Sequence, residues 1–181
     1  MFIWIIVGVI AILAIFVIAT YNGLIRLKNR VQEAESDIDV QLKRRYELIP
    51  NLIETVKGYA KHEKELFEKV TKERASLVTG STADKIEASN QLTETLKSIF
   101  AVAEAYPDLK ANQNFLQLQS DLTDTQDKIM AAQRFYNGNV RDFNTKIQVF
   151  PTNLYAKMLG FTQFGFIEAS ETEKTNVDVK F

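Results

Sequence analysis

The sequence predicts an all-α protein, in which an N-terminal transmembrane helix is followed by an elongated antiparallel bundle of about four helices. An apolar run opens the chain, and the later apolar residues recur at steps of three and four. Only 7 glycines and 3 prolines occur among the 181 residues. The period is that of an amphipathic helix, and scarce glycine and proline favour long helices over sheets and turns.

The first element is the run FIWIIVGVIAILAIFVIA, from Phe2 to Ala19, which contains no charged residue. Its length is just sufficient to cross the hydrocarbon core of a bilayer. No basic residue precedes the run and no small-x-small site ends it, so an uncleaved anchor is favoured over a cleavable signal peptide. We therefore expect a membrane anchor over residues 1–25, with residues 2–21 in contact with the bilayer.

Basic residues indicate the orientation of this anchor. None lies before the apolar run, whereas Arg26, Lys28 and Arg30 follow it directly. The positive-inside rule then places the N-terminus outside and the bundle in the cytoplasm. The protein is expected to be a single-pass protein of the cell membrane, that is, the inner or cytoplasmic membrane.

The bundle is expected over residues 26–160. An apolar stripe continues from Leu24 to Val70 with its phase preserved across Pro50, which predicts a single kinked helix or a tightly coaxial break at the proline. In TGSTAD, Gly80 is suited to end a helix, and Ser81 with Asp84 resembles a capping box at the start of the next one.

That second helix is expected to reach about Ala105, before Pro107. The longest regular pattern follows, from Phe115 to Phe150, and ends at Pro151. A short helix over 153–159 and a tail over 161–181 complete the prediction. The tail has early aromatic residues and closes on NVDVKF, the one strand-like stretch.

Polar residues on the apolar stripes are the candidate site. The side chains of Gln119, Gln126, Gln133, Asn137 and Asn144 project within roughly 40° of one another beside the stripe of the third helix. If the first helix is continuous through Pro50, then Arg45, Glu63 and Arg74 project into its apolar arc. Buried charges need partners, so we expect a network with the amides, Tyr59, Tyr136 or backbone groups. Such a network either fixes the register of the bundle or lines a binding groove.

Several functional classes receive no support from the sequence. A formal net charge of −1 argues against a nucleic-acid surface, and the absence of cysteine excludes thiol nucleophiles and thiolate metal sites. No phosphate-binding loop, nucleophile elbow or paired metal motif occurs. His62 is the one histidine, and without an orienting partner it is expected to be an ordinary helix-surface residue. We expect no enzymatic activity, no cofactor and no metal.

Four motifs occur in a characteristic order along the chain: RRYELIPNLIETVKGYAKHE, AYPDLKANQNFLQLQSDL, IMAAQRFYNGNVRDFNTKIQVFP and NLYAKMLGF. Together with the anchor, they closely resemble the LemA family of bacterial membrane proteins as far as Phe161. The resemblance implies an N-terminal anchor and a helical bundle, and it implies no established biochemical activity. It also implies partnership with envelope proteins, such as a membrane protease or a small membrane-associated domain.

The family's recurrent pattern falls on many polar positions of this chain. It falls on Arg44, Arg45, Pro50, Asn51, Lys57, Tyr59, Ala60, Glu63, Pro107, Leu109, Asn112, Leu118, Gln119, Arg134, Tyr136, Asn137, Asn144 and Pro151. The family usually has glutamate after Thr125, whereas this chain has Gln126. If that glutamate neutralises a buried arginine, this chain needs another acid or must leave the arginine more hydrated. A catalytic carboxylate at this position is thereby disfavoured.

Two functions remain. The first is a non-enzymatic membrane-anchored scaffold or interaction partner for other envelope proteins. The second is a small-ligand or signal-sensing module that binds in a polar groove of the bundle. The candidate network for either function comprises Arg44, Arg45, Asn51, Tyr59, Glu63, Gln119, Gln126, Arg134, Tyr136, Asn137 and Asn144. The identity of the partner and the oligomeric state stay open.

Overall fold

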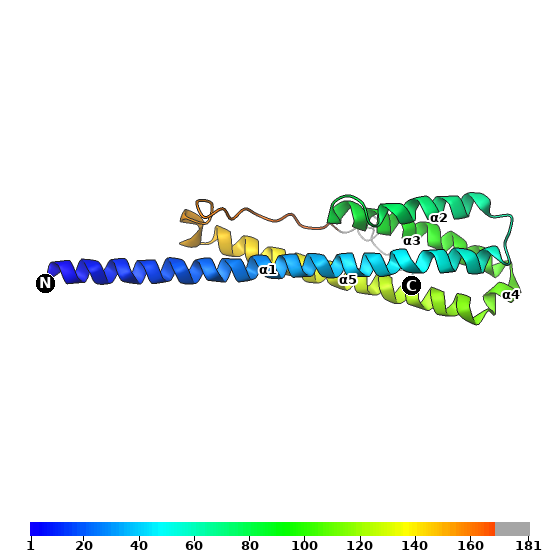
Figure 1. Ribbon diagram of the computed structural model, residues 1–181, viewed down its shortest axis with the longest axis horizontal. Helices are drawn as coiled ribbons and strands as arrows, with labels where there is room; N and C mark the ends of the chain where they lie inside the picture. Colours follow the sequence, from blue (N-terminus) through cyan, green and yellow to red (C-terminus); the bar gives the residue numbers. More distant parts are fainter. Residues whose placement is uncertain (169–181) are drawn as a thin grey trace, which may run out of the picture. The chain divides into compact units, whose positions relative to one another are not determined.

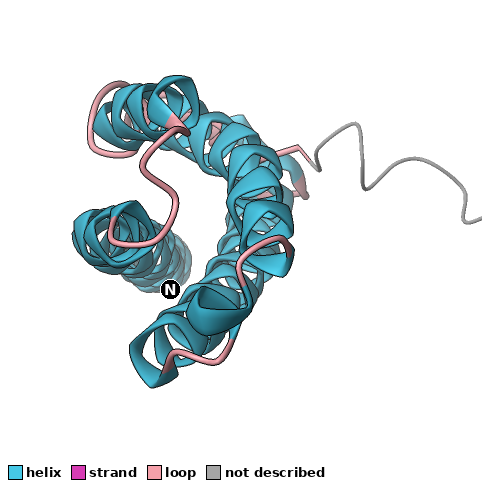
Figure 2. Ribbon diagram, turned by 90° about the vertical axis from the view of Figure 1, so that its right-hand side faces the viewer, coloured by secondary structure: helices cyan, strands magenta, loops and turns pink. Residues whose placement is uncertain are grey.

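A computed structural model describes residues 1–168 of the chain, and these residues are helices joined by turns and short loops, with no strand (Figures 1 and 2). The elements are α1 (Phe2–Lys57), α2 (Lys64–Ser76), α3 (Thr82–Glu104), α4 (Pro107–Lys110), α5 (Gln113–Gln148) and the 3-10 helix η1 (Thr152–Leu154). The all-α prediction is confirmed. The strand-like stretch NVDVKF lies outside the described residues.

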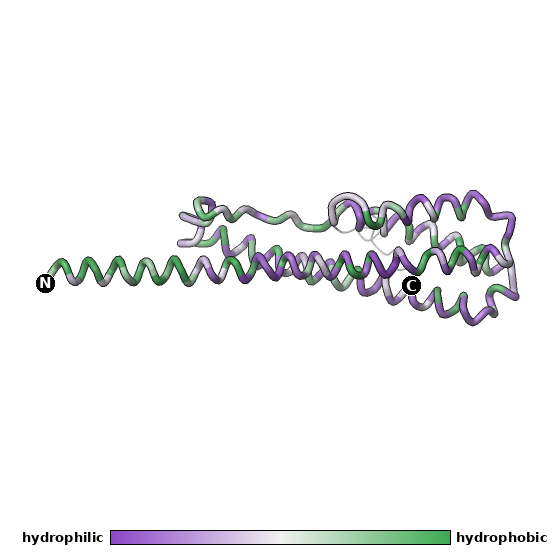
Figure 3. Tube along the Cα trace, in the orientation of Figure 1, coloured by the Kyte–Doolittle hydropathy of each residue, from purple (hydrophilic) through white to green (hydrophobic). Residues whose placement is uncertain are grey.

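Helix α1 contains the apolar run and continues through Pro50 without interruption for 56 residues. Its most apolar window of 18 residues has a mean hydropathy of 3.2, and none of that window is buried within the structure (Figure 3). An apolar helix of this length that packs on no other part of the protein suits a membrane anchor. Beyond the run, the predicted stripe is buried, including Val31, Ile38 and Ile49.

The stripe does not continue as one helix to Val70, so this part of the prediction is wrong. Helix α1 ends at Lys57 and the chain turns before α2 begins at Lys64. Gly58 opens the turn, and glycine is a poor helix former because it loses much backbone entropy on folding. Val56 before the turn, Ala60 within it and Phe67 after it are nevertheless all buried, so the apolar spacing is preserved although the chain reverses.

The other helix ends follow the local sequence signals closely. Ser81 and Asp84 form the predicted capping box of α3, and Gly80 has φ +87°, which favours glycine. Pro107 occupies the first turn of α4. The short helix expected over 153–159 is instead η1 followed by turns up to Gly160. A helix of that length is marginal without strong packing.

The described chain divides into two compact units, each with its own core. The first comprises Met1–Glu35 and Arg134–Phe166, and the second comprises Ser36–Gln133 with Ile167 and Glu168. The core of the first unit is formed by Leu24, Val31, Ala34, Tyr136, Val140, Phe143, Ala156 and Phe161. The core of the second unit includes Ile38, Leu42, Ile49, Val56, Val70, Leu92, Ile99, Leu122 and Ile129.

In the second unit the contacts give the helix directions. Arg74 of α2 reaches Tyr46, whereas Lys57 lies over the ring of Phe67, so α2 runs antiparallel to α1. Lys85 pairs with Asp39 and Ser89 bonds Arg45, so α3 is parallel to α1. Helix α5 runs antiparallel to α1, since Asn112, just before α5, bonds Tyr59 and Asp124 of α5 pairs with Arg44. This is the up-down-up-down order of a four-helix bundle.

Candidate functional site

Arg45 is the centre of the polar network in the second unit, where only 1% of its surface is exposed. Its Nη1 donates to the carbonyl oxygen of Ser89 at 3.1 Å, to the Ser89 hydroxyl at 2.6 Å and to Oε1 of Gln126. Its Nη2 donates to the hydroxyl of Thr93 at 2.9 Å. Three helices, α1, α3 and α5, therefore meet at one guanidinium.

The acceptors around Arg45 carry no formal charge. No carboxylate pairs with it in the part of the chain that the structure describes, and its Nε is buried without a partner there. Burial lowers the pKa of Arg45 to about 10, which still leaves the guanidinium cationic at neutral pH. With Gln126 in place of glutamate, we expected another acid or a more hydrated arginine. The structure has neither, because neutral hydroxyl, amide and carbonyl oxygens surround the charge.

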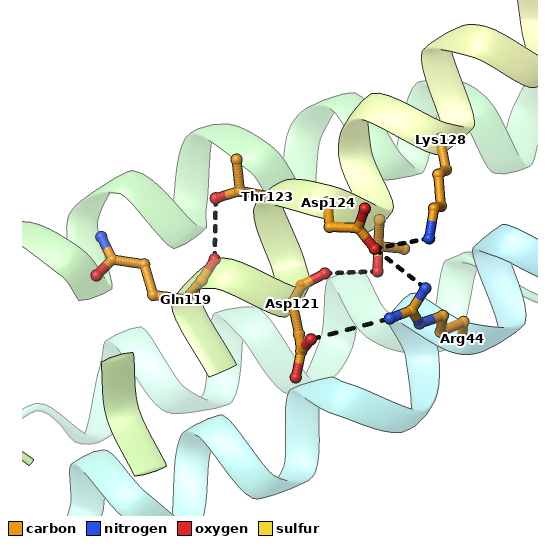
Figure 4. Close-up of polar contacts among 7 residues, drawn as sticks. Arg44, Gln119, Asp121, Thr123, Asp124 and Lys128 are labelled. Carbon is orange, nitrogen blue, oxygen red and sulfur yellow. Dashed lines mark hydrogen bonds and ion pairs between the residues drawn. The ribbon is translucent and has the colours of Figure 1, made fainter. Parts of the chain in front are cut away.

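Arg44 lies on the outer side of the same turn of α1 and pairs with acids of α5. Its Nη1 lies 3.2 Å from Asp124 and its Nη2 lies 3.9 Å from Asp121 (Figure 4). Lys128 also donates to Asp124 at 2.9 Å. The hydrogen bond from Lys128, together with the charge of Arg44, lowers the pKa of Asp124. These side chains are half-exposed, so the pairs contribute little to stability individually.

Gln119 is half-buried and lies on the same helix, with its side chain extending away from Arg44 (Figure 4). Its backbone carbonyl accepts a hydrogen bond from Thr123 at 2.9 Å. A shallow depression beside it is lined by Leu116, Gln119, Ser120, Thr123, Asp124 and Asp127. Among residues 1–168, no group of three or more His, Cys, Asp or Glu side chains is arranged to hold a metal ion.

Pro50 explains a contact between α1 and α2. Proline has no N–H, so the carbonyl of Tyr46, one turn earlier, has no intrahelical donor. Nε of Arg74 donates to that carbonyl at 2.8 Å, and its guanidinium stacks on the ring of Tyr46 at 3.6 Å from the centroid. We expected Arg74 to lie in the arc of the first helix. It belongs to α2 and completes the hydrogen bonding of α1 from outside.

In the first unit, side chains of α5 bind the backbone of the segment that follows η1. Asn144 is 6% exposed, its Nδ2 donates to the carbonyl of Phe164 at 2.9 Å, and its Oδ1 accepts from the N–H of Phe164 at 3.0 Å. The hydroxyl of Tyr136 donates to the carbonyl of Gly165 at 3.2 Å. Burial, with a smaller contribution from Glu35, raises the pKa of Tyr136.

Residues 34–181 match the LemA family. The chain belongs to the LemA family. It is 32% identical over 159 residues to Protein LemA of Metamycoplasma hominis, which covers 87% of this chain and 73% of that protein. It is 20% identical over 184 residues to magnetosome protein MamQ of Magnetospirillum gryphiswaldense, covering 87% and 68% respectively. Neither name describes an enzymatic activity.

The remaining positions of the LemA pattern do not gather into one site. Asn51 and Arg134 are exposed, and no side-chain hydrogen bond of either is found among the described residues. Asn137 is half-buried and has an interaction partner. Glu63 was expected in the apolar arc of the first helix. It instead precedes α2 as its N-cap and makes no side-chain capping bond, because the chain turns before it.

The same turn contains His62. This residue was expected on a helix surface; it is exposed but lies outside any helix. Tyr59, also in the turn, is 39% exposed and accepts a hydrogen bond from Asn112 at 3.0 Å. Asn112 in turn caps α5 by accepting from the N–H of Phe115 at 3.1 Å. Two residues of the LemA pattern therefore link the turn after α1 to the start of α5.

Ser89 and Thr93 were not predicted as partners of Arg45. Both lie on α3, four residues apart, and therefore on one helix face. Ser89 is fully buried between the buried apolar residues Ile86 and Leu92. A hydroxyl within the apolar stripe of α3 was the available signal, since buried polar groups require partners.

Proposed function

We propose that the protein is a non-enzymatic, membrane-anchored scaffold that binds another envelope protein through its helical bundle. The observation that carries this proposal is α1, a single helix that contains both the apolar span and residues of the bundle core. A chain of this kind keeps whatever the bundle binds at the membrane. The absence of any enzymatic description among the named relatives agrees with a binding role.

We place the bundle on the cytoplasmic side of the cell membrane, with the N-terminus outside. Arg26, Lys28 and Arg30 support this orientation, because basic residues next to a span are retained in the cytoplasm. The partner is then an envelope protein whose own accessible region lies on that side, such as a membrane protease or a small membrane-associated domain.

Exposed apolar side chains of the second unit are suited to locate the partner. Val40 on α1, Val78 between α2 and α3, and Leu116 on α5 are 60%, 48% and 48% exposed. A photoreactive amino acid at each position in turn, activated in intact membranes, is expected to capture the same envelope protein repeatedly from at least one position. The three positions lie on different elements, so they serve as controls for one another.

A partner that binds one face gives a different yield at each position, whereas non-specific collision gives similar yields at all three. If no protein is captured reproducibly from any position, although the variants reach the membrane at normal levels, the scaffold function is rejected. Equal capture of many proteins from all three positions rejects it as well.

The alternative is a small-ligand or signal-sensing module that uses the amide line of α5. Gln126 and Asn144 of this line are engaged within the fold, since Gln126 accepts from Arg45 and Asn144 binds Phe164. Gln119 remains beside the open depression. A ligand bound there would raise the Tm of the protein, and Gln119→Ala would abolish that rise. Gln117→Ala, at an exposed position of the same helix, would preserve it. The engagement of Gln126 and Asn144 favours the scaffold.

A further inference from the structure

The turns that follow α5, residues 149–160, present large apolar side chains to the outside. Phe150, Leu154 and Met158 are 78%, 66% and 87% exposed. Single exposed apolar residues are common, but several within one short segment indicate an interaction surface. The same turns also contain Thr152 and Ala156, which are buried, so the segment has an inner and an outer face.

The position of these turns within the first unit identifies what the outer face meets. Phe161, directly after them, packs on Tyr21 of α1 with ring centroids 5.6 Å apart, and on Phe143 of α5 at 6.2 Å. Tyr21 follows the apolar run, and tyrosine at the end of a span lies at the membrane–water interface. Figure 1 shows the turns after α5 beside α1, and Figure 3, in the same orientation, shows that the apolar stretch of α1 ends there.

The charges of this region suit a membrane surface. From Phe143 to Ile167 the chain contains no Asp or Glu, whereas Lys146 and Lys157 are basic and exposed. Acidic side chains would be repelled by anionic lipid headgroups, and lysines near the surface are attracted to them. Exposed aromatic and aliphatic residues flanked by lysine are the combination found in segments that lie in the membrane interface.

The segment is also held in place. At the start of the turns, Val149 donates its N–H to the carbonyl of Thr145 of α5 at 3.0 Å, and at their end Phe161 donates to the carbonyl of Ala156 at 3.0 Å. Asn144 and Tyr136 bind the backbone just beyond it. Because both ends of the turns are bonded to the first unit, the exposed side chains are presented without a large further loss of conformational entropy.

We propose that residues 149–160 form a second membrane contact, in which Phe150, Leu154 and Met158 enter the headgroup region of the leaflet from which α1 emerges. Lys146 and Lys157 contact anionic headgroups around them. The proposal rests on the membrane anchoring in the proposed function. It goes further in assigning a lipid surface, continuous with the span of α1, as the occupant of this apolar face.

Tryptophan fluorescence tests the contact, because the chain has one tryptophan, Trp4, which lies in the apolar run. In the full-length protein with Trp4→Phe, Phe150→Trp reports on the turns, and Phe135→Trp is the matched control. Phe135 is also exposed, at 56%, and lies on α5 about 20 Å along the helix axis from the end of the helix at Gln148. Each variant is reconstituted in phosphatidylglycerol–phosphatidylethanolamine vesicles, with and without acyl chains brominated near the headgroup.

We expect the brominated lipid to quench Phe150→Trp and to leave Phe135→Trp unaffected, with a blue-shifted emission maximum for Phe150→Trp alone. The blue shift is expected to diminish when phosphatidylcholine replaces phosphatidylglycerol. Far-UV circular dichroism checks that each variant remains folded, and Leu154→Trp replaces Phe150→Trp if that variant does not fold.

Quenching of Trp4 in the unmodified protein tests the membrane anchor separately from the second membrane contact. If Trp4 is quenched while the tryptophans at 150 and 154 are not, the protein is anchored but the second contact does not exist. A blue-shifted but unquenched tryptophan at 150 means that protein covers the turns, which also overturns the proposal. Equal quenching at 135 and 150 rejects a contact confined to the turns. An unquenched Trp4 rejects the anchor itself, and with it the membrane-tethered function.

Discussion

Arg45 shows how a buried charge is accommodated by neutral acceptors. Transferring a guanidinium from water into a protein core is costly unless its N–H groups find acceptors. Here Ser89, Thr93 and Gln126 supply them, each from a helix other than that of Arg45. The arrangement explains why α1, α3 and α5 have one register in this unit, because a shift of any one helix would remove an acceptor.

Replacing Gln126 with glutamate would give Arg45 a counter-ion. Hydrogen bonds to charged acceptors are stronger than those to neutral ones, so Gln126→Glu is expected to raise the free energy of unfolding by about 1 kcal/mol at neutral pH. The arginine would lower the pKa of the new carboxyl, so the gain is present above the ordinary glutamate pKa and is lost as the pH falls through the lowered value. Urea unfolding of the detergent-solubilised protein at several pH values measures it.

The control is Gln117→Glu, which adds the same charge at an exposed position of the same helix. It is expected to change the stability by less than about 0.5 kcal/mol. A Gln126→Glu variant that is no more stable than Gln117→Glu at neutral pH would contradict the view that Arg45 lacks a counter-ion.

The raised pKa of Tyr136 predicts that the free energy of unfolding depends on pH in the alkaline range. Burial raises its pKa above the ordinary 10.0, so the unfolded chain loses the phenol proton at a lower pH than the folded one does. The contribution is therefore complete below the ordinary pKa and is lost as the pH rises through the raised pKa. Tyr136→Phe is expected to flatten the decline in unfolding free energy above about pH 10.

At neutral pH the same variant is expected to cost about 1 kcal/mol, because the hydrogen bond to Gly165 is lost. Urea unfolding at neutral pH and at a series of alkaline values measures both effects. Parallel curves for the two proteins across the alkaline range would show that Tyr136 does not titrate differently in the folded state.

At the scale of elements, a hydrogen bond joins α2 to α1. Arg74 of α2 donates to the carbonyl of Tyr46 in α1, which has no intrahelical donor because residue 50 is proline. Arg74→Ala removes the hydrogen bond to Tyr46 and the stacking on its ring, and is expected to cost about 1–3 kcal/mol. In a Pro50→Ala background the restored N–H of residue 50 bonds the same carbonyl. The cost of Arg74→Ala is then expected to be smaller, and a double-mutant cycle measures the coupling.

Lys72→Ala provides the control for this cycle, since Lys72 is exposed on the same helix. Its cost is expected to be the same in both backgrounds. If Arg74→Ala also costs the same in both, then Arg74 does not substitute for the missing donor, and the proline and the arginine are independent features.

The helices themselves could be predicted because their evidence is local. The three-four spacing, the capping box at Ser81 and the proline at 107 act within a few residues, so α3 and α5 were expected nearly as they are. The turn after Lys57 was missed because apolar residues on both sides of it keep a helical spacing. Periodicity reports which residues are buried, and it does not report whether the chain reverses between them.

The site was predictable only in part, for a related reason. The phase of Arg45 in the stripe of α1 indicates burial, and the lost donor at Pro50 indicates a free carbonyl at Tyr46. The partners depend on how separate helices face one another, which the pattern of a single helix does not specify. Arg44 and Arg45 are nearest to that carbonyl in sequence, yet the donor is Arg74 of α2.

At the scale of the whole molecule, the orientation in the membrane decides which compartment the partners share. With the N-terminus outside, a reporter fused after Phe181 is expected in the cytoplasm. A fused enzyme that is active only in the cytoplasm should therefore be active, and one that is active only outside should be silent. The opposite pattern, at normal expression, would overturn the orientation inferred from Arg26, Lys28 and Arg30.

The burial of Arg45 also constrains the order in which the chain can fold as it is synthesised. Its acceptors on α3, Ser89 and Thr93, are made 44 and 48 residues later, and its acceptor on α5, Gln126, is made 81 residues later. A hairpin of α1 and α2 alone could not close over the guanidinium without leaving a charge unsolvated and unbonded. We therefore expect this stripe of α1 to stay open to water until α3 has emerged with three of the four hydrogen bonds of Arg45, and the burial to be completed by Gln126 of α5.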